Sequence, residues 1–489
     1  MTTGKKIVWN CVSILTGNFL NKAISIVVLM ALTVYLSPAE FGRYSFVIAY
    51  TSFFGIFTEL GINTLLTRDI SAGTVDAGYG FGHAILLRSA LTVITAVISL
   101  ASLFALGYPS DVVTLAAAAS ISLFLSFRGL FLRTVFDIPF QVNLKMAYPS
   151  FINLLNEIVT LGIILWLVRV KAGLLWLVLS INLANVPGFI AVLALSIRVI
   201  RPRFRIDARQ WKSILAQSLP LGAASFLEGV FIITPFFILS RFSTEEALGY
   251  YSLPFRLVSS LWIIPVAVMV TLLPKMSRDA KESEVSVVHG FFKGLKLVVA
   301  AGVPLALLVV CFSVPMVNIF THGRYAGSAP ALSLMIWGSL LYFVNTVYYY
   351  SFTAAGRQRV NTSAWTVVSV VAIISSLILV PAYHQMGAAA CYVISLGAGL
   401  FFNVIFAHGI LRINPLAALG RFVPGGALCA IVLFFVPVQS GVRVPVGLAL
   451  YAASIVIMKA VSIREWGEWL SRGGDAAVAP LKTADEKGK

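Results

Sequence analysis

The sequence predicts an all-α polytopic membrane protein with about fourteen transmembrane helices, forming two pseudo-symmetric six-helix lobes and two further C-terminal helices. Three observations predict this fold. Hydrophobic residues make up 59% of the 489 positions and charged residues only 11%, whereas about 25% of a soluble domain is charged. The apolar residues fall into blocks of about 20 to 25, which at about 1.5 Å per residue can cross a hydrocarbon layer of about 30 Å. The third observation is an internal repeat.

The repeat relates one segment in each half of the chain. Residues 36–45 read Leu-Ser-Pro-Ala-Glu-Phe-Gly-Arg-Tyr-Ser, and residues 243–252 read Ser-Thr-Glu-Glu-Ala-Leu-Gly-Tyr-Tyr-Ser. Gly42 aligns with Gly249 at an offset of 207 positions (249 minus 42). The same offset aligns Tyr44 with Tyr251, Asn21 with Glu228 and Arg68 with Lys275. Duplicated membrane proteins place the substrate path where their halves meet, so we expect a site between the lobes.

Each predicted span is an apolar block that is long enough to cross the membrane. In chain order the spans are residues 8–35, 44–66, 82–106, 112–135, 147–169, 173–197, 214–240, 247–273, 291–320, 328–354, 360–382, 387–411, 422–438 and 444–461. The first six form an N-terminal lobe, residues 1–200, and the next six a C-terminal lobe, residues 214–412. A basic cytoplasmic linker, residues 201–213, joins the lobes. The last two spans occupy residues 413–463, and a cytoplasmic tail follows at residues 464–489.

Basic residues indicate how the spans are oriented. They gather in alternate loops, most densely between Arg198 and Lys212, and the positive-inside rule predicts that both termini are cytoplasmic. This asymmetry, together with attraction to anionic lipid headgroups, explains the net charge of +17. It does not indicate a nucleic-acid partner, because the chain has no basic domain with interleaved aromatic residues. We expect a multi-pass protein of the cell membrane, plasma or inner.

The sequence contains no pattern typical of an enzyme active site. Paired acid and base residues on a loop, metal-spaced His and Cys residues, a phosphate-binding glycine loop and a serine nucleophile motif are all missing. The four cysteines fall within apolar spans, where a thiol behaves as a small hydrophobe. We therefore expect no enzyme activity, no cofactor and no metal site. The energy source is then a proton or sodium gradient, the membrane potential or substrate flux.

Polar side chains within the spans are the candidate functional residues, because a charge at the bilayer centre costs about 2.5 to 3.5 kcal/mol on insertion scales. In the first span Asn18, Asn21, Lys22 and Ser25 share one helical stripe. The fifth span repeats this spacing and the second comes close to it, with Asn153, Asn156, Glu157 and Thr160 in the fifth and Ser52, Glu59 and Asn63 in the second.

Two interpretations of these stripes are open. Hydrogen bonds between helices explain the Asn, Ser and Thr members. A water-filled cavity between helices is favoured for the charged members, Lys22, Glu59 and Glu157. Either way, the stripes should face the protein interior.

The second half of the chain places Glu228 in the seventh span and Arg256 in the eighth. Their opposite charges could form a pair, and the lobes would then present mixed charge toward each other. A salt bridge within one lobe is the structural alternative. His83 and Arg88, in the third span, admit a cationic rim at the inner mouth or ordinary positive-inside charge.

Several segments resemble a known family. They are Gly17-Asn18-Phe19 with Lys22, residues 36–45, residues 59–63 running to 66–70, residues 249–252 running to 273–275, residues 320–332 with Gly323-Arg324-Tyr325-Ala326, and residues 354–356 to 387–390. In these segments the chain resembles polysaccharide flippases, including those of O-antigen assembly, within the multidrug, oligosaccharidyl-lipid and polysaccharide exporter superfamily. The resemblance spans nearly all of the chain, although its motifs are degenerate and apolar.

The resemblance implies a V-shaped transporter that opens alternately to each side of the membrane. A cationic central cavity would receive the pyrophosphate of a polyprenol-linked oligosaccharide, while the lipid tail stays in the bilayer. Lys22, Arg68 and Arg256 are candidates for that headgroup, because a doubly anionic pyrophosphate in hydrocarbon needs fixed positive charge in place of water. The candidates for proton or sodium coupling are Glu59, Glu157 and Glu228, and the polar residues expected in the cavity are Asn18, Asn21, Asn153 and Asn156.

The expected function is movement of a lipid-linked oligosaccharide from the cytoplasmic to the outer leaflet for surface polysaccharide assembly. The implied partners are that substrate, membrane lipids and polysaccharide assembly proteins. A cation-coupled multidrug antiporter of the same fold is one alternative. A membrane-embedded glycan polymerase or ligase is another, which the short outward loops disfavour.

Overall fold

The protein is described by a computed structural model, which covers residues 3–280, 284–411, 420, 422–435 and 440–458. All regular structure in this part of the chain is helical. The predicted tail at residues 464–489 lies outside the described residues. The helices of the N-terminal lobe are α1 (Thr3–Tyr35), α2 (Pro38–Gly55), the 3₁₀ turn η1 (Ile56–Thr58), α3 (Ile62–Ser71), α4 (Ala77–Ala105), α5 (Ser110–Ser120), α6 (Ser122–Leu125), η2 (Leu132–Asp137), α7 (Ile138–Val142), α8 (Ala147–Arg169) and α9 (Leu174–Val199).

The C-terminal lobe follows, and two further helices extend it. Its helices are α10 (Ala208–Phe242), α11 (Glu245–Ser260), α12 (Ile263–Asp279), α13 (Glu284–Cys311), α14 (Ser313–Thr321), α15 (Ser328–Ala354) and α16 (Gln358–Leu411), and the added pair is α18 (Val423–Phe435) and α19 (Ser440–Ile457). Helix α16 is really two helices that meet at His384, whose backbone angles (φ 48°, ψ −125°) are not helical. The two parts correspond to the predicted spans at residues 360–382 and 387–411.

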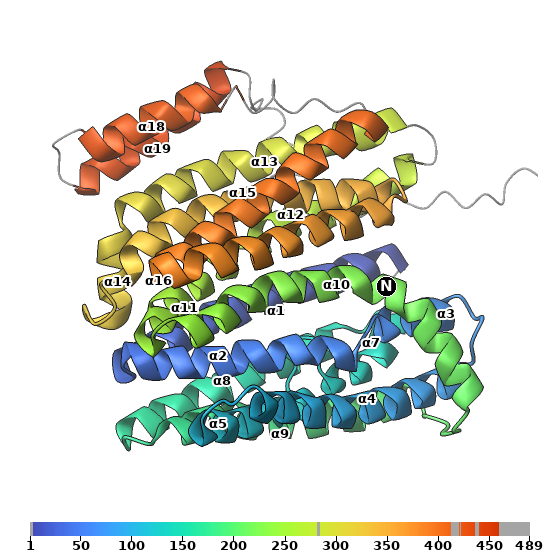
Figure 1. Cartoon of the computed structure of the whole chain (residues 1–489). Helices are drawn as coiled ribbons and strands as arrows, with labels where there is room; N and C mark the ends of the chain where they lie inside the picture. Colours follow the sequence, from blue (N-terminus) through green and yellow to red (C-terminus); the bar gives the residue numbers. More distant parts are fainter. Residues whose placement is uncertain (1–2, 281–283, 412–419, 421, 436–439, 459–489) are drawn as a thin grey trace, which may run out of the picture.

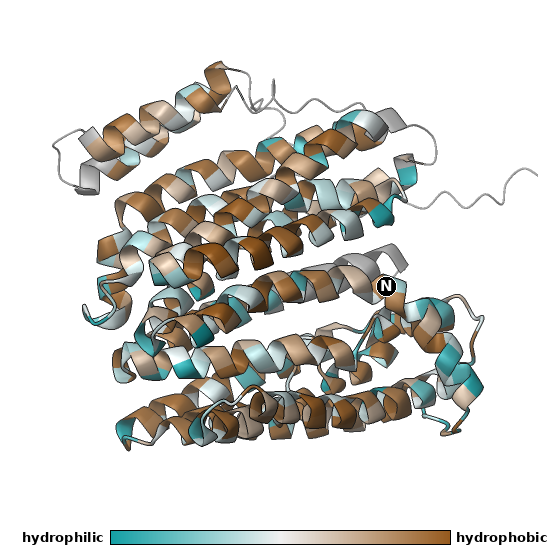
Figure 2. Cartoon of the chain, viewed as in Figure 1, coloured by the Kyte–Doolittle hydropathy of each residue, from teal (hydrophilic) through white to brown (hydrophobic). Residues whose placement is uncertain are grey.

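The prediction of about fourteen spans in two lobes is confirmed. Ten helices among the described residues are long and apolar enough to cross a membrane. The division of α16 at His384 supplies one more span. Shorter apolar helices at Ser110–Leu125, Val423–Phe434 and Val444–Ile457 supply the others. Hydrophobic residues predominate along most of each helix, and hydrophilic residues are more frequent toward the helix ends and loops (Figure 2).

The repeated segment is a helix start signal used once in each lobe. Ser37 caps α2 by accepting a hydrogen bond from the backbone N–H of Glu40, and the Glu40 carboxylate accepts one from Ser37 in return. Pro38 occupies the first turn, where its missing N–H costs nothing. Thr244 caps α11 in the same way through Ala247. Duplication of this signal gives α2 and α11 the same place in their lobes.

Two predicted spans are broken helices, which corrects the expectation of continuous ones. The second span divides at Leu60 and Gly61, both with positive φ (45° and 84°), and α3 begins after them. The fourth span stops being helical between α6 and η2, where Gly129 has a φ of +123°. Glycine adopts such angles without the steric cost that other residues bear. Both breaks place backbone and polar side chains inside the N-terminal lobe.

The lobes lie one above the other, with α1, α10 and α11 running between the outer layers (Figure 1). Helix α2 packs against α11, and α3 against the first part of α10. Both contacts bring backbone against backbone at glycines. A Cβ added to Gly42 would lie 2.9 Å from the Gly249 nitrogen, and one added to Gly61 would lie 2.9 Å from the Gly222 nitrogen. The lobes are therefore in close backbone contact at both of these places, one toward each end of the second span.

Charged and polar groups reinforce the end of the molecule at which α2 and α11 begin, which we call the α2–α11 end. Arg43 of the N-terminal lobe forms ion pairs with Asp111 (2.9 Å) and with Glu245 of the opposite lobe (3.3 Å). Arg324 donates to the Val34 carbonyl (2.9 Å), and the Tyr325 hydroxyl lies 3.1 Å from the carbonyls of Leu36 and Ser37, between α1 and α2. These bonds hold the two lobes together at this end.

Candidate functional site: a cationic cluster between the lobes

Four charged side chains from both lobes come together in the membrane interior. Lys22 lies on α1, Arg128 in the break of the fourth span, Glu157 on α8 and Arg256 on α11. The charges of Arg128, Glu157 and Arg256 all act on Lys22, and Arg128 also acts on Arg256. Lys22 is nevertheless an exposed residue. Lys22 is thus accessible, and its charge interacts with charges of both lobes, which agrees with the expectation that a charged side chain within a membrane span has charged partners or faces water.

Arg256 connects the lobes through aromatic rings. Its guanidinium lies over two rings of α2, at 5.6 Å from the centroid of Phe41 and 5.3 Å from that of Tyr44. Cation–π contacts of this kind stabilise a cation that has lost part of its water. Arg256 is half-buried, so its contact with α2 leaves part of the guanidinium accessible.

Glu157 is the carboxylate of the cluster. Arg128 donates to it twice, from Nε to Oε1 at 3.1 Å and from Nη2 to Oε2. The Ser25 hydroxyl, one turn along α1 from Lys22, donates to Oε1 at 2.9 Å. The Glu157 side chain is 2% exposed and that of Arg128 is 31% exposed. The sequence stripes on the first and fifth spans therefore do meet, through Ser25 and Glu157.

A second polar group lies deeper in the N-terminal lobe and holds the two broken spans in place. Arg88 is fully buried and donates to the carbonyls of Thr58, Leu130 and Phe131, and to side-chain oxygens of Asn63 and Thr134. These acceptors come from both breaks. Arg88 therefore does not form a cationic rim at the inner mouth, because its guanidinium is enclosed and bonded.

Glu59 belongs to this deeper group. Its carboxylate accepts hydrogen bonds from the backbone N–H groups of Gly61 (2.8 Å) and Asn63 (2.9 Å), at the start of α3. A carboxylate at a helix N-terminus satisfies free N–H groups and compensates the helix dipole. Glu59 therefore stabilises the restart of the second span, and its role in ion coupling stays a prediction.

The other candidate headgroup residue, Arg68, lies apart from the cluster. Its side chain is 62% exposed and pairs with the neighbouring Asp69 at 2.8 Å.

The candidate asparagines divide between the surroundings of the cationic cluster and the interior of the N-terminal lobe. Asn18 is exposed and Asn21 half-buried beside Lys22 in sequence, whereas Asn153 accepts a hydrogen bond from the buried Arg133 at 2.7 Å. Asn156 is buried against Gly188.

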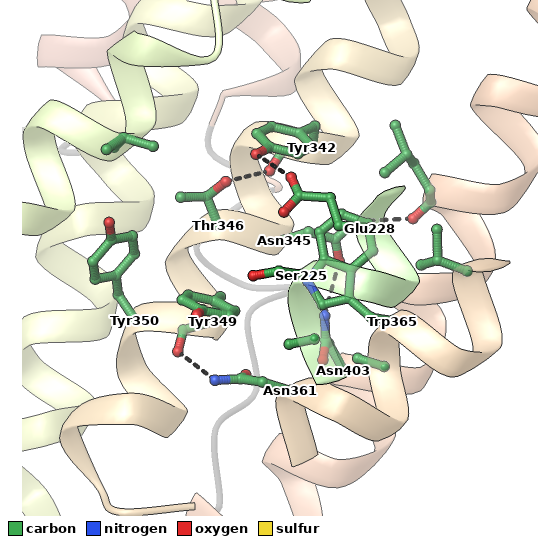
Figure 3. Close-up of a pocket in the computed structure, with 15 residues that line it drawn as sticks. Ser225, Glu228, Tyr342, Asn345, Thr346, Tyr349, Tyr350, Asn361, Trp365 and Asn403 are labelled. Atoms are coloured by element: carbon green, nitrogen blue, oxygen red, sulfur yellow. Dashed lines mark hydrogen bonds between the residues drawn. The ribbon is translucent and has the colours of Figure 1, made fainter. Parts of the chain in front are cut away.

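Glu228 lies in a separate cavity within the C-terminal lobe (Figure 3). The cavity has a volume of about 190 Å³ and lies between α10, α12, α15 and α16. The Tyr342 hydroxyl donates to Glu228 at 3.4 Å. The other polar and aromatic lining residues are Ser225, Asn345, Thr346, Tyr349, Tyr350, Asn361, Trp365 and Asn403. Among the described residues no ion pair joins Glu228 to Arg256, so the suggested pairing of these two charges is wrong.

The charged cluster was only partly predicted. Lys22, Glu157 and Arg256 are among the candidates from the sequence, whereas Arg128 is not. The sequence does carry a signal for it, because Arg128, Gly129 and Arg133 interrupt the apolar block of the fourth span. Within the described residues, no group of three or more His, Cys, Asp or Glu side chains could hold a metal ion.

A protein-family model matches the part of the chain that contains the cluster. Residues 7–279, just over half of the chain, match the model of the polysaccharide biosynthesis protein family. The chain belongs to this family. A relative, the uncharacterized membrane protein MJ1068 of Methanocaldococcus jannaschii, is 24% identical over 109 residues, and the matched stretch spans only 22% of each chain. All four residues of the cationic cluster fall within the family match.

Solved structures confirm the fold of this member of the polysaccharide biosynthesis protein family. The lipid II flippase MurJ in an inward closed conformation is similar with a TM-score of 0.76 and 14% identity, covering 92% of this chain and 98% of that one. An inward-facing multidrug resistance MATE family transporter of the MOP superfamily has a TM-score of 0.61 and 13% identity, covering 83% and 99%. A MOP superfamily transporter from Pyrococcus furiosus has a TM-score of 0.59 and 12% identity, covering 85% and 100%.

Proposed function

We propose that the protein is a flippase that moves a polyprenyl-pyrophosphate-linked oligosaccharide from the cytoplasmic to the outer leaflet, for surface polysaccharide biosynthesis. The observation that carries the proposal is the cluster of three cations, Lys22, Arg128 and Arg256, with the single carboxylate Glu157. This cluster has a net charge of +2, which balances the charge of about −2 that a pyrophosphate diester carries. The protein would act as a transporter and not as an enzyme.

Electrostatics explains why such a cargo needs this site. Moving an ion into a low-dielectric interior is very unfavourable unless fixed charges and hydrogen-bond donors replace its water. Guanidinium groups suit the task because their planar donors match phosphate oxygens in pairs. The lipid tail requires no such site, since it stays in the bilayer. Sugars would occupy the space beyond the cluster, where Asn18 and Asn21 offer amide groups.

Alternating access is the mechanism that the lobe contacts support. The α2–α11 end, which we propose faces outward with both termini cytoplasmic, is joined by the Arg43 ion pairs and by Arg324 and Tyr325. Opening this end requires that these bonds break, that the glycine contacts separate and that Arg256 leaves the rings of Phe41 and Tyr44. Each lobe would move as a unit, because Arg88 ties the broken spans of the N-terminal lobe together.

The cavity around Glu228 is the candidate site for coupling to a proton or sodium gradient. Its carboxylate faces hydroxyl and amide groups, which are suitable oxygen ligands for a small hard cation. It is separated from the cationic cluster, so a cation there would not compete with the substrate headgroup. Membrane lipids and polysaccharide assembly proteins are the other proposed partners, and the cell membrane is the proposed location.

The multidrug antiporter alternative shares the fold but does not account for three cations at the lobe interface. An organic cation as cargo would be repelled by a cluster of net charge +2. A glycan polymerase or ligase would change the covalent structure of the substrate, which transport does not.

A flipping assay in liposomes tests the proposal. The purified chain is reconstituted with a labelled polyprenyl-pyrophosphate sugar, and access to the label on the far leaflet is measured together with the intact mass of the substrate. We expect flipping with no change in mass, and loss of flipping in Lys22→Ala and Arg256→Ala. Arg169→Ala, which removes an exposed cation at the end of α8, is the control and should flip normally. Normal flipping by both cluster variants would contradict the proposed site.

A further inference from the structure

Arg128 is bonded differently from Arg88, the buried arginine that holds the broken spans of the same lobe. Arg88 is fully buried, with acceptors on all three nitrogens of its guanidinium. Arg128 uses only Nε and Nη2, both on Glu157, and no residue in the described part of the chain accepts from its Nη1. Its side chain is also 31% exposed. Arg128 therefore keeps an unused donor on a partly accessible side chain whose charge acts on Lys22.

The break in the fourth span positions this guanidinium. The chain leaves α6 at Leu125, and the Arg128 N–H donates to the Ser126 hydroxyl at 3.1 Å. Gly129 then turns the chain with a φ of +123°. Arg88 holds the far side of the break at the carbonyls of Leu130 (3.1 Å) and Phe131 (2.6 Å). The backbone that carries Arg128 is thus fixed, and only the side chain is left to move.

Glu157 is a carboxylate held in place by its surroundings. It is 2% exposed, and Ser25 fixes its Oε1 from the opposite helix. A carboxylate presents two oxygens to a guanidinium as a phosphate does, so the two anions compete for the same donors. Glu157 therefore accepts from the donors that a phosphate group would use.

We propose that Arg128 is a third headgroup-binding cation and that Glu157 is its internal competitor, which holds Arg128 in the empty site and reclaims it when the cargo leaves. The inference rests on the proposed function, because it assumes a pyrophosphate ligand at the cluster. Competition of this kind weakens binding, but it lets a doubly charged headgroup be released from a site of three cations. Arg128 supplies a positive charge and hydrogen-bond donors to the headgroup, and Glu157 sets how tightly the headgroup binds.

Binding of inorganic pyrophosphate to the full chain in nanodiscs tests this inference by titration calorimetry. Glu157→Gln removes the competing charge and keeps the side-chain shape, so Kd should fall by about tenfold, the low end of measured couplings between close charge pairs. Arg128→Gln should raise Kd by about tenfold for the same reason. In the double variant most of the gain from Glu157→Gln should disappear, because its main effect acts through Arg128 and only the interaction of Glu157 with Lys22 remains. Arg169→Gln is the control and should leave Kd unchanged.

A purely structural ion pair gives a different result. Glu157→Gln and Arg128→Gln would then each raise Kd, or each would change only the thermal unfolding temperature. Either result would overturn the inference. Ser25→Ala provides a milder test if Glu157→Gln fails to fold, because it removes only the hydroxyl that orients Glu157. It should lower Kd by a smaller factor, and an unchanged or higher Kd would count against the inference.

The same experiment separates this inference from the proposed function. If the wild-type chain binds pyrophosphate but Glu157→Gln does not tighten it, only the competitor role is lost. If neither the wild type nor any variant binds pyrophosphate, the headgroup site and the inference both fall. In the flipping assay, Glu157→Gln should slow turnover even as its affinity rises, since release becomes the slow step.

Discussion

The contact between Gly42 and Gly249 offers the most direct test of how the lobes move. These residues are equivalent positions of the two repeats, and they bring α2 and α11 together backbone to backbone. Gly249→Ala would place a methyl carbon 2.7 Å from the carbonyl carbon of Pro38 and 3.1 Å from its Cα. Both atoms belong to the backbone, so no flexible side chain can move aside.

The structure gives the size of the effect. A methyl group in ordinary contact lies at least 3.4 Å from its neighbours, so the shortest of these two distances falls 0.7 Å short (3.4 minus 2.7). The Pro38 carbonyl oxygen lies closer still to the added methyl group, so the helices must separate by more than this amount. Overpacking of this kind costs about 1 to 3 kcal/mol. Because the strain exists only when the α2–α11 end is closed, the ratio of open to closed conformers should rise about 5- to 150-fold.

Distances between two spin labels measure this ratio. On a background without native cysteines, labels at Ser110 and Glu246 report on opposite lobes, since both are exposed in the first turns of α5 and α11. Gly249→Ala should add or enlarge a longer-distance population. Gly162→Ala is the matched control, because a Cβ at this glycine of α8 meets no atom within 4 Å. An unchanged distance distribution in Gly249→Ala, or an equal change in the control, would refute the reasoning.

Two further predictions concern stability. Arg88→Met leaves the carbonyl acceptors of both breaks without a donor, so the free energy of unfolding should fall by about 3 to 5 kcal/mol; the thermal unfolding temperature of the purified protein measures it, and a temperature equal to that of Arg169→Met would contradict it. Asp207 caps α10 outside the membrane, and hydrogen bonds from the backbone N–H groups of Gln210 and Arg209 lower the pKa of its carboxyl. The cap should therefore contribute stability above the unfolded pKa of about 3.9 and lose it as the pH falls through the lower folded value. Hydrogen exchange in the first turn of α10 at neutral and acid pH measures this, and Asp207→Asn, which keeps the cap but not the charge, should remove the pH dependence.

The spans and their order could be predicted from the sequence because they depend on the length and hydrophobicity of local segments. The repeat was equally readable, since its Ser, Pro and Glu residues are the local signals that begin a helix. The stripe on the first span predicted that Lys22 and Ser25 would face the interior, and the structure brings Ser25 to Glu157. These features require no knowledge of which helix packs against which.

The breaks and the partners of the charges could not be predicted in this way. Arg128 reaches Glu157 only because the fourth span stops being helical, and that break is fixed by Arg88 from a different span. The sequence presents Glu59 as an intramembrane charge, yet Glu59 caps α3, which begins three residues later. Such roles follow from tertiary contacts between distant segments, which periodicity does not record.

The added pair α18 and α19 packs on α13 of the C-terminal lobe, with the Tyr451 hydroxyl donating to the Val299 carbonyl at 3.4 Å and the Cys311 thiol to the Leu433 carbonyl at 3.5 Å. A pair fastened in this way travels with its lobe. The C-terminal lobe is thereby larger than the N-terminal lobe, and it occupies more area in the plane of the bilayer. Drag from the surrounding lipid rises with that area, so during each cycle the N-terminal half should swing through the wider arc.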